Sequence, residues 1–418
     1  MTIWQISSSY LLERKIPAVL TIFSLALGVA LISCVLTLRA ESQTHFETYS
    51  GTFDAIVGAK GNPSQVVMST LFYLDIPVGT IPFGVLSIVQ EHPHVENAYP
   101  IAIGDSYREF RIIGSSPGLL NDKRNGVEFA AGRSFVRRGE VVLGSRVAAE
   151  TGLKIGDSFV STHGFDEELG HEHDVPFVVT GILRQSNSPD DVAIFTDIES
   201  VWTACGSWHI EQERHDHATH THAADANADS EKSQSEVGAL TAILVKLKPG
   251  ESSKEFQADI NANFAAMAVL PRDEVARLYV KEIALLRNAL MIVAVLVVVV
   301  SIVSLAVNLY MSVLQRKRDI AVMRSLGAGS SDIFGVVLCE SGALTTVALL
   351  AGSLTGHLAA WLLGMELANR SGVVIQAFSI QAGELTSYAL VLAAALTAAV
   401  IPAMRSYRTD IALDLAEE

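Results

Sequence analysis

The chain has 418 residues, of which 50% are hydrophobic and only 18% charged, and its formal net charge is −15. An ordinary soluble domain is about one quarter charged, so this composition argues against a soluble globular protein and favours an integral membrane protein. Residues 39–287 alone hold 35 Asp and Glu against 21 Lys and Arg, which argues against nucleic acid as the partner of that segment.

The first 16 residues are too short and too polar to span a membrane. Apolar residues recur at helical spacing at Ile3, Ile6 and Tyr10, which predicts an amphipathic interfacial helix over 1–16, with a solvated tail as the alternative. The apolar block that follows contains Cys34 in a stretch similar to a lipoprotein cleavage box. Because the apolar run continues beyond this cysteine, we expect an uncleaved signal anchor.

Four long apolar blocks predict four membrane-spanning helices. Each has the roughly 20 residues that a helix needs to cross about 30 Å of hydrocarbon. Every backbone amide in a bilayer must be paired within its own segment, so we expect helices even in the β-branched second block. The predicted spans are residues 17–38, 288–314, 333–364 and 385–404.

Basic residues in the short loops indicate how the spans are oriented. They precede the first span, lie between the second and third, and follow the fourth, whereas the loop 365–384 has only Arg370. The positive-inside rule therefore predicts that both termini, the loop 315–332 and the tail 405–418 are cytoplasmic. The segment 39–287 and the loop 365–384 are then extracytoplasmic.

The extracytoplasmic segment is long enough to form one or two domains with their own core. Strand-like runs alternate with Gly, Asn and Pro turns and with two helical stretches, which predicts an α+β domain. The glycine-rich stretch 51–61 is expected to be a turn or loop near the membrane, and 273–286 a helix leading into the second span. The expected strands are 105–113, 140–144, 176–183 and 239–247, and the expected helices are 144–153 and 252–267.

The predicted fold class is therefore an α-helical membrane protein with four transmembrane helices and a large α+β extracytoplasmic domain between spans 1 and 2. The third and fourth spans are almost free of charge, which argues against a hydrophilic ion path. His357 is the one candidate there, and a helix-packing or outer-interface position is expected for it. Small residues of the third span, including Gly352 and Gly356, suit close helix contact within a dimer.

The cytoplasmic loop 315–332 carries a short amphipathic pattern. Ile320, Met323 and Leu326 lie three residues apart, and Gly327 follows, which predicts a short helix that ends at the glycine. By itself this pattern indicates only a basic interfacial loop.

The same stretch resembles the signature of the MacB–FtsX family of ABC-transporter permeases. The family pattern has Glu-Ile-Gly, then a basic residue before Leu-Gly-Ala, and a Glu about a dozen residues later. The matching positions here are Asp319-Ile320-Ala321, Arg324, Leu326-Gly327-Ala328 and Glu340, with Asp and Ala as departures from the family's Glu and Gly. Further resemblances at residues 10–30 and 402–410 extend the likeness to both ends of the chain.

The resemblance implies a non-catalytic permease subunit that works with a separate ABC ATPase subunit, on which ATP and Mg²⁺ are bound. The chain itself lacks a Gly-x-x-x-x-Gly-Lys-Ser/Thr phosphate-binding loop. The family implies mechanotransmission, in which ATP-driven movement of the spans reaches the periplasmic domain and serves export, lipoprotein release or activation of a partner. The implied ATPase-coupling residues are Arg318, Asp319, Ile320, Met323, Arg324, Leu326, Gly327 and Ala328.

The family also implies a bacterial cytoplasmic (inner) membrane location. It implies a homodimer or a pairing with a second permease, together with a periplasmic or lipoprotein partner. Neither a Gly-x-Ser-x-Gly elbow nor a metalloprotease helix is present in the sequence, so an intrinsic membrane enzyme has little support.

A histidine-rich tract provides an alternative function. Eight of the twelve histidines fall between residues 163 and 222, next to carboxylates and partly within a polar, low-complexity loop near 206–235. Imidazole and carboxylate ligands suit zinc, so this chain could instead be a membrane-anchored zinc-binding receptor or a component of metal homeostasis. The alternative is a solvated loop that binds metal only incidentally. The candidate zinc ligands are His171, His173, His215, His217, His220 and His222.

Overall fold

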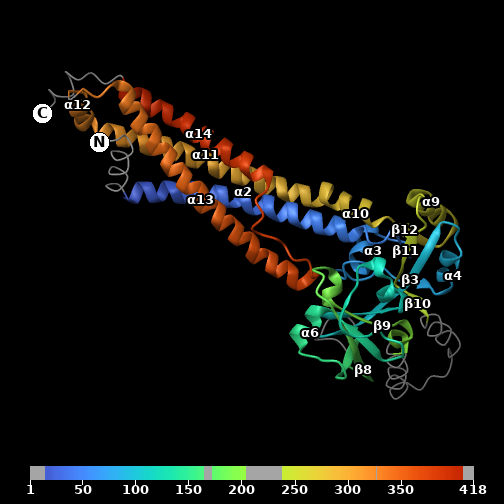
Figure 1. Ribbon diagram of the computed structural model, residues 1–418. Helices are drawn as coiled ribbons and strands as arrows, with labels where there is room; N and C mark the ends of the chain where they lie inside the picture. The colour runs from blue at the N-terminus through green and yellow to red at the C-terminus, as the bar shows by residue number, and fades with distance from the viewer. Residues whose placement is uncertain (1–14, 164–171, 204–237, 326, 408–418) are drawn as a thin grey trace, which may run out of the picture. The chain divides into compact units, whose positions relative to one another are not determined.

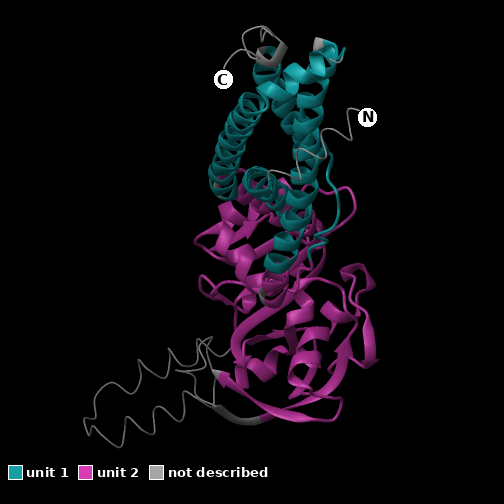
Figure 2. Ribbon diagram, turned by 90° about the vertical axis from the view of Figure 1, so that its left-hand side faces the viewer, with its two compact units in different colours: residues 1–42, 282–364, 375–418 teal, residues 43–281, 365–374 magenta. Residues whose placement is uncertain are grey.

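The computed structural model describes residues 15–163, 172–203, 238–325 and 327–407, and the chain divides into two compact units (Figure 2). Unit 1, a helical bundle, comprises residues 1–42, 282–364 and 375–418, and unit 2, a mixed α/β domain, comprises residues 43–281 and 365–374. Four long apolar helices with a mixed α/β domain between the first and second confirm the predicted fold class.

The helices of unit 1 are long because their apolar blocks continue into polar but strongly helical flanks. Within the described residues, four helices are long and apolar enough to cross a membrane. The apolar part of each helix is long enough to cross a bilayer. The helix continues past this part because its backbone hydrogen bonds continue. They are α2 Lys15–Ser50, α11 Ala284–Gln315, α13 Ser330–Ser371 and α14 Ala382–Tyr407, with the short α12 Lys317–Ser325 between α11 and α13 (Figure 1).

Glycines bring α13 against α2. A Cβ at position 352 would lie 2.6 Å from the carbonyl oxygen of Ala26, and a Cβ at position 356 would lie 2.6 Å from that of Ala30. Such close backbone approach is typical of small residues four apart in membrane helices. The expectation that Gly352 and Gly356 serve contact within a dimer is therefore wrong, since α2 of the same chain already covers them.

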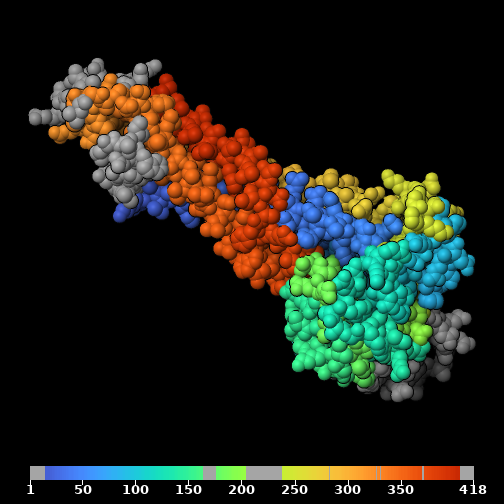
Figure 3. Space-filling view, in the orientation of Figure 1, coloured from blue at the N-terminus to red at the C-terminus, as the bar shows by residue number. Residues whose placement is uncertain are grey.

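The rest of the bundle is held by small apolar clusters between neighbouring helices. Leu305 and Leu309 of α11 pack with Leu344 of α13 and with Ala395 and Ala399 of α14. In Figure 3, α13 and α14 lie side by side. Both helices carry large apolar side chains that remain exposed, such as Leu350 and Leu390. In a bilayer such faces contact lipid or another subunit.

Unit 2 is built on a mixed sheet of ten strands among the described residues. The strand order is β12-β1-β11-β3-β4-β9-β6-β8-β5, with β7 paired to β3 and β8. A second sheet pairs β2 Ile81–Pro82 with β10 Ala239–Leu240. The strands of the large sheet are β1 Ala55–Ala59, β3 Val95–Tyr107, β4 Phe110–Ser115, β5 Phe129–Gly132, β6 Glu140–Leu143, β7 Ser158–His163, β8 Glu172–Leu183, β9 Ala193–Asp197, β11 Ala242–Leu247 and β12 Ala266–Val269.

Apolar clusters cover both faces of this sheet. Alternate residues of a strand point to opposite faces, so Ile56 packs with one cluster and Val57 with another. The covering helices and turns are α3 Pro63–Thr70, α4 Gly84–Gln90, α5 Gly118–Asn121, η1 Lys123–Asn125, α6 Ser145–Thr151, η2 Pro189–Val192, α9 Ser253–Asn263 and α10 Pro271–Leu278. The π-helical turn η3 Tyr279–Ile283 joins α10 to α11.

The structure corrects the expected loop at 51–61. Residues 55–59 form β1, a fully internal strand paired with β11 on one side and β12 on the other. The glycines misled the prediction: Gly58 sits within the strand, where Val66 and the backbone of Thr241 pack closely against it. Gly in a strand interior often marks such a close approach rather than a turn.

Three other element boundaries differ from the expected ones. The strand expected over 105–113 is a hairpin, because Arg108 adopts φ 53° and turns the chain between β3 and β4. The helix expected over 252–267 ends at Asn263, and the chain then pairs with β1 as β12. The helix expected over 273–286 is interrupted by the π-helical turn η3.

Candidate functional site

The segment between α11 and α13 forms a two-faced helix, α12. Ile320 and Ala321 are buried, at 7% and 3% exposed, and Met323 packs beside them against Ile333 of α13. The opposite side of the helix is polar, and Arg318 and Asp319 lie exposed there. The apolar spacing read from the sequence therefore matches the anchored face of this helix.

A glycine ends α12 and reverses the chain toward α13. Gly327 has φ +100°, its amide donates to the Arg324 carbonyl at 3.1 Å, and the Ala328 amide donates to the Met323 carbonyl at 3.0 Å. Left-handed glycine after a helix is a common C-terminal cap, because no Cβ opposes that conformation. Gly327 is exposed, Arg324 and Ala328 are half-buried, and Leu326 lies outside the described residues.

A buried ion pair joins the end of α11 to α13 next to this segment. Nη1 of Arg316 lies 3.2 Å from Oε2 of Glu340, and the two side chains are only 12% and 7% exposed. Charges this deep are stable only when paired, so the two residues fix the start of α12 against α13. Glu340 belongs to the family pattern in the sequence, whereas its pairing with Arg316 appears only in the fold. Two small cavities adjoin Glu340, and among their lining residues are Thr21, Asn308, Ser312, Ile320, Met323 and Val336.

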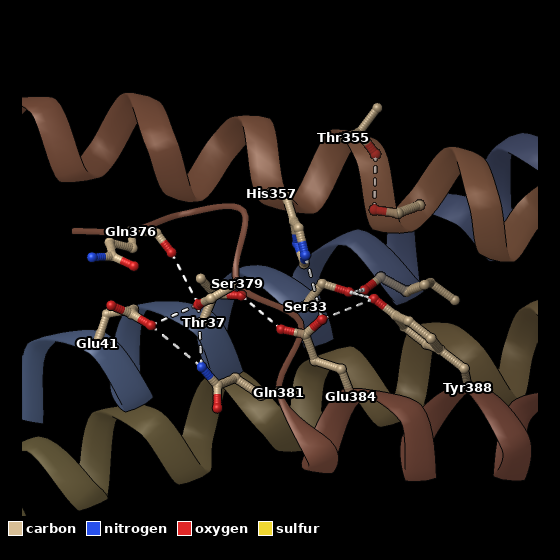
Figure 4. Close-up of polar contacts among 12 residues, drawn as sticks. Ser33, Thr37, Glu41, Thr355, His357, Gln376, Ser379, Gln381, Glu384 and Tyr388 are labelled. Carbon is tan, nitrogen blue, oxygen red and sulfur yellow. Dashed lines mark hydrogen bonds and ion pairs between the residues drawn. The ribbon is translucent and has the colours of Figure 1, made fainter. Parts of the chain in front are cut away.

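A second polar cluster lies inside the bundle, centred on the fully buried Glu384 of α14 (Figure 4). Thr37 of α2 donates to Oε1 of Glu384 at 2.7 Å, and the Tyr388 hydroxyl donates to Oε2 at 3.3 Å. Nε2 of His357, from α13, lies 3.5 Å from the same Oε2. Three helices of the bundle thus meet at one carboxylate.

The cluster continues in both directions along α2. The Ser33 and Tyr388 hydroxyls are 2.7 Å apart, and Glu41 accepts hydrogen bonds from Ser379 at 2.6 Å and Gln381 at 3.3 Å (Figure 4). These contacts hold the segment before α14 against α2.

Sequence reasoning missed Glu384 because it lies one residue before the predicted start of the fourth span. A signal was present on α2, since Ser33, Thr37 and Glu41 recur every four residues and so share one helix face. His357 is 5% exposed and lies between helices, which agrees with the helix-packing interpretation.

The zinc hypothesis finds no support. Within residues 15–163, 172–203, 238–325 and 327–407, no group of three or more His, Cys, Asp or Glu side chains could hold a metal ion. Of the candidate ligands, only the backbone of His173 is described, in β8. The others lie outside the described residues: His171, His215, His217, His220 and His222.

Two family models match the chain. Residues 18–263, more than half of the chain, match the MacB-like periplasmic core domain, and residues 291–411 match the FtsX-like permease C-terminal domain. The first match begins in α2 and extends through α9, and the second includes α12 and the polar residues of α13 and α14.

Curated relatives agree with these families. An uncharacterized ABC transporter permease of Methanocaldococcus jannaschii is 25% identical over 194 residues, covering 45% of this chain and 41% of the relative. The lipoprotein-releasing system transmembrane protein LolE of Haemophilus influenzae is 24% identical over 259 residues, covering 58% of this chain and 55% of the relative. The chain thus spans about half the length of the curated relatives it matches.

Solved structures similar to this chain include two extracytoplasmic domains. The periplasmic region of MacB from Actinobacillus actinomycetemcomitans has a TM-score of 0.33 at 10% identity, covering 55% of this chain and 95% of that one. The extracellular domain of the ABC-type transporter YknZ from Gram-positive bacteria has a TM-score of 0.30 at 10% identity, covering 52% and 98%.

Proposed function

The chain belongs to the MacB/FtsX family of ABC transporter permeases, and from that premise we propose that it couples a separate ATPase subunit to movement of its own extracytoplasmic domain. In this proposal the chain is non-catalytic, and ATP and Mg²⁺ bind to the partner subunit. The proposed substrate is extracytoplasmic. The similarity to the lipoprotein-releasing system transmembrane protein LolE supports a lipid-anchored or periplasmic molecule as its class.

The construction of α12 is the observation that carries this proposal. Ile320 and Ala321 anchor one face, while Arg318, Asp319 and the 45% exposed Val322 face outward. A protein that pressed on the outward face would therefore push a helix already tied to α11 and α13. The eight residues from Arg318 to Ala328 named above are our candidate coupling residues.

Continuous helices supply a route for that push. A helix is stiff along its axis, so a displacement at one end is delivered at the other. Both α2 and α13 run without interruption from the bundle into segments that belong to unit 2, at residues 43–50 and 365–371.

The proposal includes an orientation and a partner copy. Basic residues near both termini and around α12 support cytoplasmic placement of these parts and an inner-membrane location. The exposed apolar faces of the bundle support pairing with a second permease subunit, either a copy of this chain or a related one.

Charge reversal on α12 tests the coupling assignment. We expect Arg318→Glu to reduce both the yield of co-purified ATPase and its activity in the complex. Lys254→Glu, on the exposed side of α9, makes the same charge change and should leave both unchanged. Full co-purification and activity of Arg318→Glu, together with a Leu326→Arg and Gly327→Arg double variant, would remove α12 as the coupling element.

Tag accessibility tests the orientation separately. A tag placed after residue 325 should be protected in intact cells, and a tag at residue 215 should be reached from outside the membrane. Detection of both tags on the same side would reject the transmission route.

A further inference from the structure

One short loop of unit 2 touches the ends of two long helices. It consists of residues 186–192, including the 3₁₀ turn η2, and is called the η2 loop below. It leads directly into β9, which lies in the large sheet between β4 and β6. A shift of this loop would therefore act on the interior of the domain.

The end of α2 is tied to the η2 loop by a tyrosine. The Tyr49 hydroxyl donates to Oδ1 of Asp190 at 2.7 Å, and the Tyr73 hydroxyl lies 3.4 Å from the same oxygen. The Tyr49 ring also packs on Phe72, with centroids 5.6 Å apart, so the last turns of α2 are fixed within the core. Tyr73 holds φ 56°, a strained value for a residue with a side chain, and such strain persists only where surrounding contacts impose it.

The end of α13 reaches the same loop through a glycine. Gly372 caps the helix with φ +71°, and its amide donates to the Ala368 carbonyl at 2.9 Å. A Cβ at this position would lie only 2.2 Å from the carbonyl oxygen of Ser188, so only glycine lets the two backbones meet. A hydrogen bond between Arg146 of α6 and Asn369 adds a second tie.

The loop itself is braced, so it can pass on a displacement. The carboxylate of Asp191 accepts the amides of Ser186 at 3.0 Å and Asn187 at 2.7 Å, and the hydroxyl of Ser145 at 2.9 Å. These bonds join the loop to the first residue of α6 as well as to itself.

We propose that the η2 loop is the point at which movements of α2 and α13 enter the extracytoplasmic domain, with Asp190 as the residue that positions α2 on it. This inference rests on the proposed function. Beyond the proposed function, it names the loop that receives the movement and the residue on which the contact with α2 depends.

The chemistry of Asp190 provides a readout that a merely structural residue would lack. The pKa of Asp190 is raised to about 6, chiefly because the carboxyl is buried and also because Asp191 lies beside it, while the hydroxyls of Tyr49 and Tyr73 lower it. The carboxylate therefore changes charge between about pH 5 and 7. Asn at this position keeps an acceptor oxygen for Tyr49 but cannot ionise.

Hydrogen exchange of the full complex tests the inference. The chain is co-expressed with its ATPase, placed in lipid nanodiscs, and compared with and without ATP and vanadate by mass spectrometry. We expect exchange in peptides covering 186–192 to differ at least about threefold between the two states. Tyr49→Phe should reduce this difference, whereas Tyr107→Phe, a matched change elsewhere in unit 2, should not.

The pH profile completes the test. In the wild type the nucleotide-dependent difference should change between pH 5 and 7, and Asp190→Asn should show a flat profile. A profile of unchanged shape in Asp190→Asn would mean that Asp190 is not the positioning residue. Nucleotide-dependent exchange elsewhere in 43–281 but not in 186–192 would overturn the η2 loop and leave the proposed function intact. No nucleotide effect anywhere in 43–281 would overturn both.

Discussion

Removing one partner of the Arg316–Glu340 pair should destabilise the bundle far more than removing both. The side chains are 12% and 7% exposed, so Glu340→Ala takes the carboxylate away from a largely buried guanidinium. Breaking a buried pair in this way costs about 3 to 5 kcal/mol, and the residual exposure places the expected loss near about 3 kcal/mol. Replacing both with apolar residues of similar size, Arg316→Met with Glu340→Leu, removes both buried charges together and should cost about 1 kcal/mol or less.

The assay is a double-mutant cycle on the purified full chain in mild detergent, with unfolding followed by denaturant titration. Arg316→Met alone and Glu340→Leu alone complete the cycle, and a positive coupling free energy of about 2 kcal/mol or more is expected. The reasoning is refuted if Glu340→Ala loses less than about 1 kcal/mol, or if the double variant loses as much as the sum of the single variants. Either result would mean that solvent or lipid headgroups already screen the pair.

Three further changes test other parts of the structure. Gly356→Ala should cost about 1 to 3 kcal/mol of unfolding free energy in the same titration, because the added Cβ meets a backbone oxygen. The control Gly342→Ala should cost little, since the nearest atom to its added Cβ is 3.8 Å away. Equal losses would contradict the close packing of α13 on α2. Glu384→Ala should destabilise the bundle more than Thr37→Val, which loses one hydrogen bond worth about 1 kcal/mol, and the reverse order would show that the carboxylate is not the centre of the cluster. Because the folded-state pKa of Asp190 is raised to about 6, its ionised form is disfavoured in the fold, and this penalty is relieved as the pH falls from about 6 to 4. Relative to Asp190→Asn, the wild type should therefore gain up to about 3 kcal/mol between pH 7 and 4, and a constant difference across that range would contradict the raised pKa.

Local patterns of the sequence were sufficient for the membrane helices and for α12. A long apolar block can cross a bilayer only as a helix, so each span could be predicted without knowing which segments pack against it. The spacing of Ile320 and Met323 likewise identified the buried face of α12, because helical periodicity is local. The extracytoplasmic strands were harder to delimit, since a turn such as that at Arg108 depends on a single backbone angle.

The glycine-rich stretch around Gly58 shows the limit of such reasoning. Its composition indicated a loop, yet the stretch contains β1, whose partners β11 and β12 come from a part of the chain about 190 or more residues later. Pairing between strands that are distant in the sequence overrides local propensity. The residues around Gly58 do not indicate this pairing.

From its sequence alone, this protein is determined to have four spans, an inserted α+β domain and an amphipathic segment between the second and third spans, because each of these follows from the composition and periodicity of a contiguous stretch. Only the tertiary structure decides which polar groups meet. Arg316 contacts Glu340, which is 24 residues away in the sequence. Thr37 contacts Glu384 over 347 residues, and Tyr49 contacts Asp190 over 141 residues. Such contacts form only when helices and strands pack together. Their geometry depends on segments that are far apart in the sequence, so it cannot be deduced from any one of them.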